Sequence, residues 1–362
     1  MKYDLKEKKI NKSKNSVRPF VYNIPSVSAV SLRFIFLLAI QIFLLILTKS
    51  YSALLIITCS IIGALFAAGA DYIINREPLY NIPNIIIPGI FIGMLLPETY
   101  PPLIALVITA MTIFFSRSIV FKGINSWLNI APLAIVIAWH IGKQYFPDFL
   151  LNTGIINLRN SSVYLIENGS FPTYSFDSSV TNYLNKYIFN IFNVTVPEGF
   201  VSFIWDTHSV IPAFRFNLVT IISSIFIFSD NAFSLIIPSL FLFVYALLVR
   251  LLGTFLFGGY FNQGDILLAL FTSGILFCAV FLIQWYGTIP VTICGKIILG
   301  IISGIIAFTI IGAGTSPIGM AFTVLISNIC CMLIRVFEEK NNEIETAKVI
   351  EELSAKVSGD SK

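Results

Sequence analysis

The chain is a succession of long apolar runs, and these runs constrain its fold more than any other feature of the sequence. They occupy residues 33–49, 52–70, 84–97, 102–120, 127–146, 213–229, 232–252, 264–284, 293–312 and 317–337. Most of them approach the length that an α-helix needs to cross about 30 Å of hydrocarbon. Because a backbone in lipid must satisfy its own hydrogen bonds, each run is expected to be helical. The sequence therefore predicts an all-α polytopic membrane protein with about ten transmembrane helices.

The composition indicates that the solvent of most side chains is lipid. Hydrophobic residues make up 56% of the 362 residues and charged residues only 12%, which departs far from the values of soluble domains. A water-soluble fold is therefore excluded. No C-x-x-C pair occurs, so neither a disulfide framework nor a zinc site is predicted. The five cysteines lie in or beside apolar runs and are expected to be small buried side chains; they are Cys59, Cys278, Cys294, Cys330 and Cys331.

The two ends of the chain are polar and are expected to lie on the same side of the membrane. Residues 1–32 form a basic tail in which seven Lys or Arg face two acids within KYDLKEKKINKSKNSVR, as the positive-inside rule expects of a cytoplasmic segment. This tail lacks interleaved aromatic residues, so nucleic acid is not a predicted partner. An even number of crossings returns the charged tail 338–362 to the cytoplasm. The predicted location is a bacterial cytoplasmic (inner) membrane, crossed many times, with both termini cytoplasmic.

One long polar segment, residues 147–212, divides the apolar runs into two groups of five. It follows the fifth run, so the predicted topology places it outside the cytoplasm. Its Asn, Ser, Thr, Tyr and Phe content favours an ordered loop, and loops of this length are often functional. The predicted organisation is thus a first five-helix repeat over 33–146, the extracytoplasmic loop, and a second five-helix repeat over 213–337.

The third run of each group contains a glycine at what looks like a corresponding position. Gly89 lies in IIIPGIFIGMLLP and Gly274 in LFTSGILF, and a proline-bearing turn follows each run. Five helices per repeat is an odd number, so the two repeats must be inverted relative to one another. In such folds, interrupted helices line a site near the membrane midplane. The alternative is that these are ordinary glycines and prolines of transmembrane helices.

Charged side chains are nearly absent from the interior of the apolar runs. The acidic and basic residues that border the runs, Asp71, Asp230, Arg250 and Asp265, all fall at predicted ends. Intramembrane ionisable groups usually mark self-contained ion pumps, so their absence favours passage of a neutral solute or electron carriers bound at the faces. The two histidines, His140 and His208, are widely separated in the sequence, which does not favour a metal or haem site.

The last third of the chain carries two motifs. A T-x-P-x-T turn followed by Gly and a basic residue consists of Thr288, Pro290, Thr292, Gly295 and Lys296. A P-x-G-x-A-F segment that ends in Asn consists of Pro317, Gly319, Ala321, Phe322 and Asn328. Both resemble motifs of the RnfD/NqrB family, membrane subunits of ion-translocating redox complexes. In the first half, GIFIGMLLPETYPP and FKGINSWLNIAPLA are similar to the family in outline. The resemblance covers nearly the whole chain after residue 30.

The resemblance implies a covalent flavin. The family holds FMN through a phosphoester to the Thr of an S-G-A-T motif on its outer loop. Here Ser178 and Thr181 keep the spacing, but the intervening residues are Ser179 and Val180. Thr181 is therefore the candidate attachment site, with Ser178, Thr288 and Thr292 as further candidate cofactor-binding residues. The family's G-E-T-S segment reads Phe214-Arg215-Phe216-Asn217, and its M-A-T-D-P run is replaced by LIQWY at 282–286.

These features predict a divergent RnfD/NqrB-type subunit that couples flavin-mediated electron transfer to Na⁺ or H⁺ transport. Its partners would be the lipid bilayer and other subunits of a membrane redox complex, and FMN its cofactor. It would not work alone, so any enzymatic role is that of one subunit of a translocase. The alternative is a redox-inactive relative that acts as a small-solute transporter or as a structural membrane subunit. The coupling ion, the electron donor and acceptor, any solute and the subunit composition are not predicted.

Overall fold

The computed structural model describes residues 26–75, 82–116, 128–147, 161–229, 233–285, 289–312, 316 and 318–359, and the described part is helical with no strand. Four described helices are long and apolar enough to cross a membrane: α1 (Val27–Leu47), α2 (Tyr51–Asn75), α14 (Ile293–Ile311) and the apolar part of α15 (Gly319–Gly359). Five more apolar helices are shorter, namely α3 (Ile82–Leu95), α4 (Pro102–Phe115), α5 (Ile130–Ile141), α10 (Asn217–Phe228) and α11 (Ile236–Leu252). Together they give a helical membrane protein.

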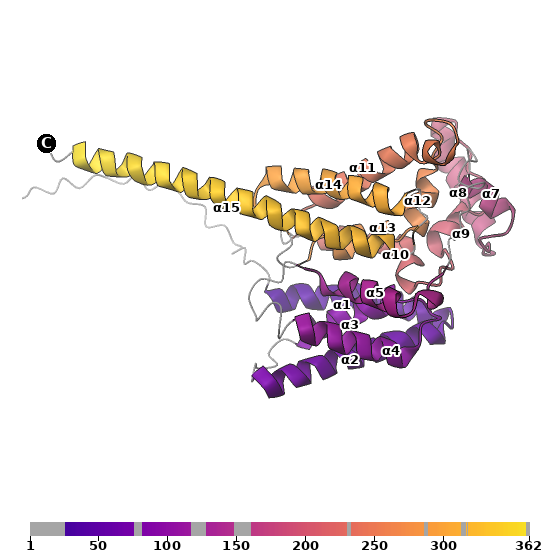
Figure 1. Cartoon of the computed structure of the whole chain (residues 1–362). Coiled ribbons are helices and arrows are strands. Elements are labelled where there is room, and N and C mark those ends of the chain that lie inside the picture. Colours follow the sequence, from indigo (N-terminus) through magenta and orange to yellow (C-terminus); the bar gives the residue numbers. More distant parts are fainter. Residues whose placement is uncertain are drawn as a thin grey trace, which may run out of the picture.

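The helices form two bundles that lie side by side, as Figure 1 shows. The first bundle holds α1 to α5, in which α2 packs on α3 and α4, and α3 packs on α1 and α5. The second bundle holds α10 to α15, in which α14 packs on α11 and α15. Each predicted run coincides with a helix or with a set of consecutive short helices. This agreement follows from the runs themselves, since continuous apolar stretches in lipid can only be helical.

The third run of the second bundle is not one helix. It consists of α12 (Ile266–Thr272), the single turn α13 (Ile275–Phe277) and the π-helical segment η6 (Cys278–Leu282). Gly274, with φ of +71°, separates α12 from α13. In the first bundle, by contrast, α3 runs unbroken through Gly89.

The predicted break at Gly89 is therefore wrong, and the glycine serves helix packing instead. A Cβ at Gly89 would lie 2.9 Å from both the Ser60 carbonyl oxygen and the Ala64 Cβ of α2. Gly93, one turn further along, would meet the Ile57 Cα at 2.6 Å. Small residues one turn apart let two membrane helices approach closely, and this contact fixes α3 against α2.

The segment between the bundles forms a third part, at one end of the molecule (Figure 1). It contains α7 (Ser161–Glu167), α8 (Asp177–Tyr187), the short helix η3 (Phe189–Phe192) and α9 (Phe200–Trp205). Its small core holds Leu165, Ile166, Phe171, Phe200 and Phe203, against Leu268, Phe271 and Leu276 of the second bundle. The predicted loop 147–212 is thus an ordered helical layer over the described residues 161–212, here called the α7–α9 segment.

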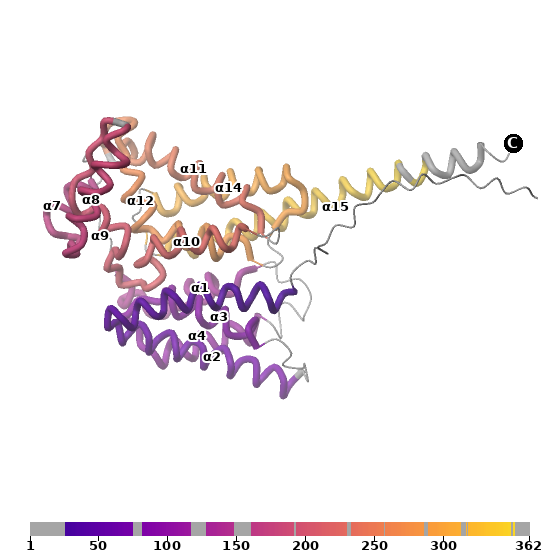
Figure 2. The backbone as a smooth tube through the Cα atoms, turned by 180° about the vertical axis from the view of Figure 1, so that it is seen from behind, coloured from indigo at the N-terminus to yellow at the C-terminus, as the bar shows by residue number. Residues whose placement is uncertain are grey.

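The last helix, α15, is 41 residues long and leaves the second bundle at the end opposite to the α7–α9 segment, as Figure 2 shows from behind. The predicted boundary between the last apolar run and the charged tail, at residue 338, lies inside this continuous helix. Most of the predicted tail therefore continues the transmembrane helix. Residues 1–25, which include most of the predicted basic tail, lie outside the described residues.

Candidate functional site

A buried carboxylate, Asp177, holds the α7–α9 segment together. Its Oδ1 accepts hydrogen bonds from the Gly199 amide at 2.8 Å and the Thr181 hydroxyl at 3.0 Å. Its Oδ2 accepts from the amide and the hydroxyl of Ser202, both at 2.6 Å. Gly199 has φ of +102°, and a Cβ there would meet the Ile166 Cγ2 at 2.2 Å. One side chain thus joins the start of α8 to the start of α9.

Hydrogen bonding decides the charge of this carboxylate. Burial by itself would raise the pKa of Asp177, but the hydrogen bonds from Ser202, Gly199 and Thr181 outweigh burial and hold the pKa below its ordinary value. The group is therefore ionised at neutral pH and accepts four hydrogen bonds in that state.

We expect the α7–α9 segment to loosen as the pH falls through this lowered pKa. A carboxyl whose folded pKa is depressed contributes stability that is present above its unfolded pKa of about 3.9 and is lost in acid. Hydrogen exchange of the segment, followed from roughly pH 6 to pH 3, measures this loss. In an Asp177→Asn variant the part of the acid dependence that comes from this carboxyl should disappear, while the part that comes from other carboxyls, such as Asp206, should remain. An unchanged acid dependence in that variant would contradict the assignment.

The geometry around Thr181 bears on the predicted flavin attachment. Thr181 is 2% exposed, and its hydroxyl donates to Asp177, while Ser178 is half-buried on the same helix. A phosphoester at the Thr181 Oγ1 would need the hydroxyl to leave the core and would bring negative charge beside an ionised carboxylate. The described arrangement therefore does not fit an FMN phosphate at Thr181. Attachment of FMN at Thr181 stays a prediction, and the ion path proposed below does not require it.

A second buried charge cluster joins both bundles to the α7–α9 segment. Arg215, just before α10, makes a two-pronged contact with Asp206: its Nε lies 3.0 Å from Oδ1 and its NH2 2.6 Å from Oδ2. Its NH1 donates to the Ser50 hydroxyl at 2.5 Å and lies 3.6 Å from Glu98 Oε1. Ser50 and Glu98 belong to the first bundle. This arginine therefore ties together three parts of the chain.

The outer edge of this cluster is aromatic. The Tyr174 hydroxyl donates to Asp206 Oδ2 at 3.3 Å and lies 3.3 Å from His208 Nε2. His208 has φ of +52°, and its amide donates to Asp206 Oδ1 at 2.8 Å. Burial would raise the pKa of Asp206, but the hydrogen bonds and the charge of Arg215 hold it below its ordinary value. Asp206 is thus ionised at neutral pH and paired with Arg215.

The break at Gly274 packs against Phe214 and Asn217, which flank Arg215 in the sequence. A Cβ at Gly274 would lie 2.0 Å from the Phe214 ring, so only glycine allows this contact. The side chain of Asn217 donates to the Phe271 carbonyl at 3.0 Å, which satisfies one acceptor at the end of α12. On the far side, the π-helical segment η6 has its Leu282 carbonyl bound by the Asn129 amide at 3.1 Å. Two amide side chains therefore support the interrupted helix.

Aromatic rings fill the interface between the two bundles. Phe34 and Phe91 come from the first bundle and meet Phe277, Phe281 and Trp285 of the second, with ring centroids between 4.8 and 6.4 Å apart. All five are nearly fully buried. We call this set the aromatic seal. It lies along α13, η6 and the residues just after them, so the broken helix and the seal form one unit.

The predicted cofactor residues of the T-x-P-x-T turn lie elsewhere. Thr288 is outside the described residues. Thr292 caps α14, where its hydroxyl accepts from the Gly295 amide at 3.0 Å and donates to Glu338 of α15. Glu338 also accepts from the amides of Val291 and Thr292, and a Cβ at Gly295 would meet its Oε1 at 2.1 Å. The described half of this motif therefore anchors α15 to α14.

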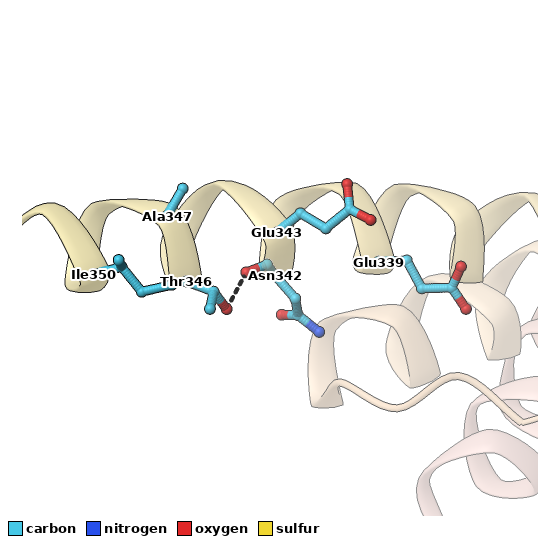
Figure 3. A pocket seen from close by; sticks show the side chains of 6 residues that line it. All are labelled: Glu339, Asn342, Glu343, Thr346, Ala347 and Ile350. Atoms are coloured by element: carbon cyan, nitrogen blue, oxygen red, sulfur yellow. Dashed lines mark hydrogen bonds between the residues drawn. The ribbon is translucent and has the colours of Figure 1, made fainter.

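Two surface hollows lack the arrangement of polar groups that a catalytic or cofactor site needs. One, of about 400 Å³, lies between α4 and α5 and has an almost wholly apolar lining that includes Met111, Phe115 and Ile137. The other follows a single face of α15, shown in Figure 3, with the lining residues Glu339, Asn342, Glu343, Thr346, Ala347 and Ile350. Its described lining comes from one helix, so it has no opposing wall. Among the described residues, no group of His, Cys, Asp or Glu is arranged to hold a metal ion.

The residues that organise the outer end carry no motif of their own in the sequence. Arg215 stands there only as part of the segment Phe214-Arg215-Phe216-Asn217, and Asp206, Asp177 and Glu98 belong to no recognisable pattern. One signal was present in the sequence. A lone arginine near the start of an apolar run, as Arg215 is in 213–229, needs a partner when it lies at a membrane boundary.

These features define a helical integral membrane protein in which two bundles meet on a sealed interface beside a broken helix. A family model described as the NQR2, RnfD, RnfE family matches residues 14–343. The chain belongs to this family, and it is a membrane subunit of the Rnf/Nqr type of complex. The resemblance predicted from the two motifs is therefore confirmed. A search of curated proteins gives no match.

Proposed function

We propose that this chain provides the ion path of an Rnf/Nqr-type complex and couples flavin-mediated electron transfer in that complex to Na⁺ or H⁺ movement. The observation that carries the proposal is the broken helix at Gly274 beside the aromatic seal. A coupled path must stay closed except when electrons pass, and buried rings with no charged side chain among them give such a barrier. A break in a helix frees backbone carbonyls, which can coordinate a cation.

We also propose that the chain crosses the membrane ten times. The nine apolar helices and the α12–η6 set would make ten crossings, arranged as two inverted repeats. The support for this topology is the similar packing in both bundles: α2 packs on α4 as α11 packs on α14, and α1 packs on α3 as α10 packs on α13. The α7–α9 segment would lie outside a bacterial inner membrane and α15 would end in the cytoplasm, because the basic tail precedes the first crossing.

Opening of the path would need a local change in the broken helix. Within the third run of the second bundle, helical hydrogen bonding departs from the regular pattern at Gly274 and in the π-helical turns of η6. Phe277 belongs to α13 and Phe281 to η6, so a shift of this segment moves two rings of the seal. Asn217 and Asn129 hold the two ends of the segment through carbonyl oxygens. The segment is therefore the moving part and the first bundle the fixed wall.

We expect a Phe281→Leu variant to uncouple the complex. A smaller side chain opens a gap between Phe34, Phe91 and Phe277, which lets ions leak back. In proteoliposomes that contain the whole complex, the electron-transfer rate should stay within about twofold of wild type while the ion gradient falls at least about fivefold. Phe308→Leu is the matched control, because Phe308 is buried in α14 away from these rings. Equal gradients in the two variants would refute the proposed path.

A second candidate function is that of a subunit without its own flavin, acting as a structural membrane part of the complex or as a small-solute transporter. The enclosed Thr181 hydroxyl supports it. Flux of a solute through liposomes that hold the purified chain alone would indicate the transporter.

Intact mass of the chain from its native membrane, compared with a Thr181→Val variant, tests the flavin. A wild-type mass higher by one FMN and lost in the variant would establish attachment at Thr181. An unmodified wild-type chain is the result expected for the second candidate. Because Thr181→Val also removes one hydrogen bond to Asp177, the variant should be less stable by about 1 kcal/mol.

A further inference from the structure

Helix α8 carries three different stripes along its length. Asp177 and Thr181 are buried against α9. A second stripe is apolar and exposed, at helical spacing, and its residues are Phe176 (39% exposed), Val180 (37%), Tyr183 (61%) and Tyr187 (54%), continued by Ile191 (75%) in η3. A third stripe, Ser179, Asn182 and Lys186, is polar and exposed. The protein buries the first stripe, covers Phe176 and Val180 in part, with the Phe176 ring stacked on Tyr174 at 5.4 Å, and leaves Tyr183 and Tyr187 more than half exposed.

The arrangement of these stripes points to a boundary between protein, water and an apolar phase. A helix that only faced water would not expose four apolar residues in a row, three of them aromatic. A helix fully enclosed by a partner protein would not keep a continuous polar stripe beside the apolar one. Helices that lie in a membrane interface have both faces, with aromatic residues at the level of the lipid headgroups.

The surroundings of the apolar stripe agree with a lipid surface. The α7–α9 segment lies at one end of the two bundles (Figure 1). Helices that cross a membrane leave the hydrocarbon at their ends. Lys186 is the only charged residue on the exposed faces of α8, and its ammonium group lies 5.2 Å from the centre of the Tyr187 ring. Exposed Tyr260 and Phe261 precede α12 at the same end. Two exposed tyrosines beside one lysine suit phosphate-bearing headgroups.

We propose that α8 lies on the bilayer surface and inserts Phe176, Val180, Tyr183 and Tyr187 among the lipid headgroups, with Lys186 beside a lipid phosphate. The lipid would hold the outer side of α8 while Asp177 holds its inner side. This position fixes the height of the α7–α9 segment above the membrane. The inference does not depend on the proposed ion path.

Site-specific photo-crosslinking in native membranes tests this position. p-Benzoylphenylalanine is introduced in place of Tyr183, in place of Asn182 on the polar stripe, and in place of Phe66 and Phe243, which are each 63% exposed on α2 and α11 and serve as lipid-facing controls. Irradiated chains are purified and their masses measured. The position of Tyr183 should give a phospholipid adduct at a yield at least about fivefold above that of Asn182 and similar to the two controls.

Two results would overturn the proposal. An adduct of Tyr183 with another protein would make the stripe a subunit interface. Absence of a lipid adduct at Tyr183, with lipid adducts present at Phe66 and Phe243, would place the stripe in water. Because all four side chains are exposed, the substitutions should leave the core intact, and an unchanged gel-filtration profile of each variant verifies this.

Discussion

Replacing Arg215 with methionine is expected to lower the free energy of unfolding by about 3–5 kcal/mol, because the variant leaves Asp206 buried without its cation. The side chain of Asp206 is 0% exposed and that of Arg215 is 7% exposed, and the pair shares two hydrogen bonds. The guanidinium also donates to Ser50. The loss should therefore loosen the contact between the first bundle and the α7–α9 segment as well as the pair itself. Thermal unfolding in a fixed detergent measures it.

A double variant distinguishes the cost of an unpaired buried charge from the cost of the other lost contacts of Arg215. Arg215→Met combined with Asp206→Leu removes both charges, and it should recover a large part of the lost stability because no buried ion is left unpaired. Arg250→Met is the matched control, since Arg250 binds Asn262 and the Gly264 carbonyl at a more exposed site and should cost about 1 kcal/mol. An Arg215→Met variant as stable as Arg250→Met would show that the buried pair contributes little.

Gly274→Ala should be nearly as damaging, at about 2–5 kcal/mol. Two effects add: an L-residue in the left-handed region costs about 1–2 kcal/mol, and the new Cβ overlaps the Phe214 ring, which costs about 1–3 kcal/mol more. The ring cannot move freely, since Phe214 is 3% exposed and packed in the main core. Unfolding in detergent and the yield of folded chain are the readouts.

The chain offers a control that separates these two effects. Gly258 has φ of +85°, and a Cβ there would meet no atom within 4 Å. Gly258→Ala therefore carries only the conformational cost, and the difference between the two variants measures the overlap with Phe214. A Gly274→Ala, Phe214→Ala double variant should recover that difference, less the cost of the lost ring. Equal effects of Gly274→Ala and Gly258→Ala would mean that the contact with Phe214 is not tight.

The helices were predictable from the sequence, and the sites were not. Apolar runs in lipid leave the backbone one solution, so the positions of α1, α2, α14 and α15 follow from hydropathy and length. The break at Gly274 needs a positive φ, whereas Gly89 lies in the regular helix α3, where its missing Cβ lets α2 approach closely. Both glycines look alike in the sequence, because the difference lies in what packs against them.

The contacts of the charged groups could not be predicted from the sequence either. Asp206 and Arg215 are close in sequence, but Glu98 and Ser50 reach them only through the packing of the first bundle. Thr181 matched a flavin motif by its spacing, yet its burial depends on Asp177, Ser202 and the fold of the α7–α9 segment. Tertiary contacts of this kind leave no local pattern. Family resemblance, which rests on motifs spread over the chain, was the more reliable guide to the class of protein.

Because α15 is continuous, it can act as a rigid rod that extends beyond the second bundle. A single helix of 41 residues is roughly 60 Å long, and it continues unbroken from the second bundle to Gly359. Glu338 fixes this rod to the start of α14 near its middle. A displacement of the C-terminal part of α15 would therefore be transmitted along the helix to the contact between Glu338 and α14. That contact passes it on to the core of the second bundle.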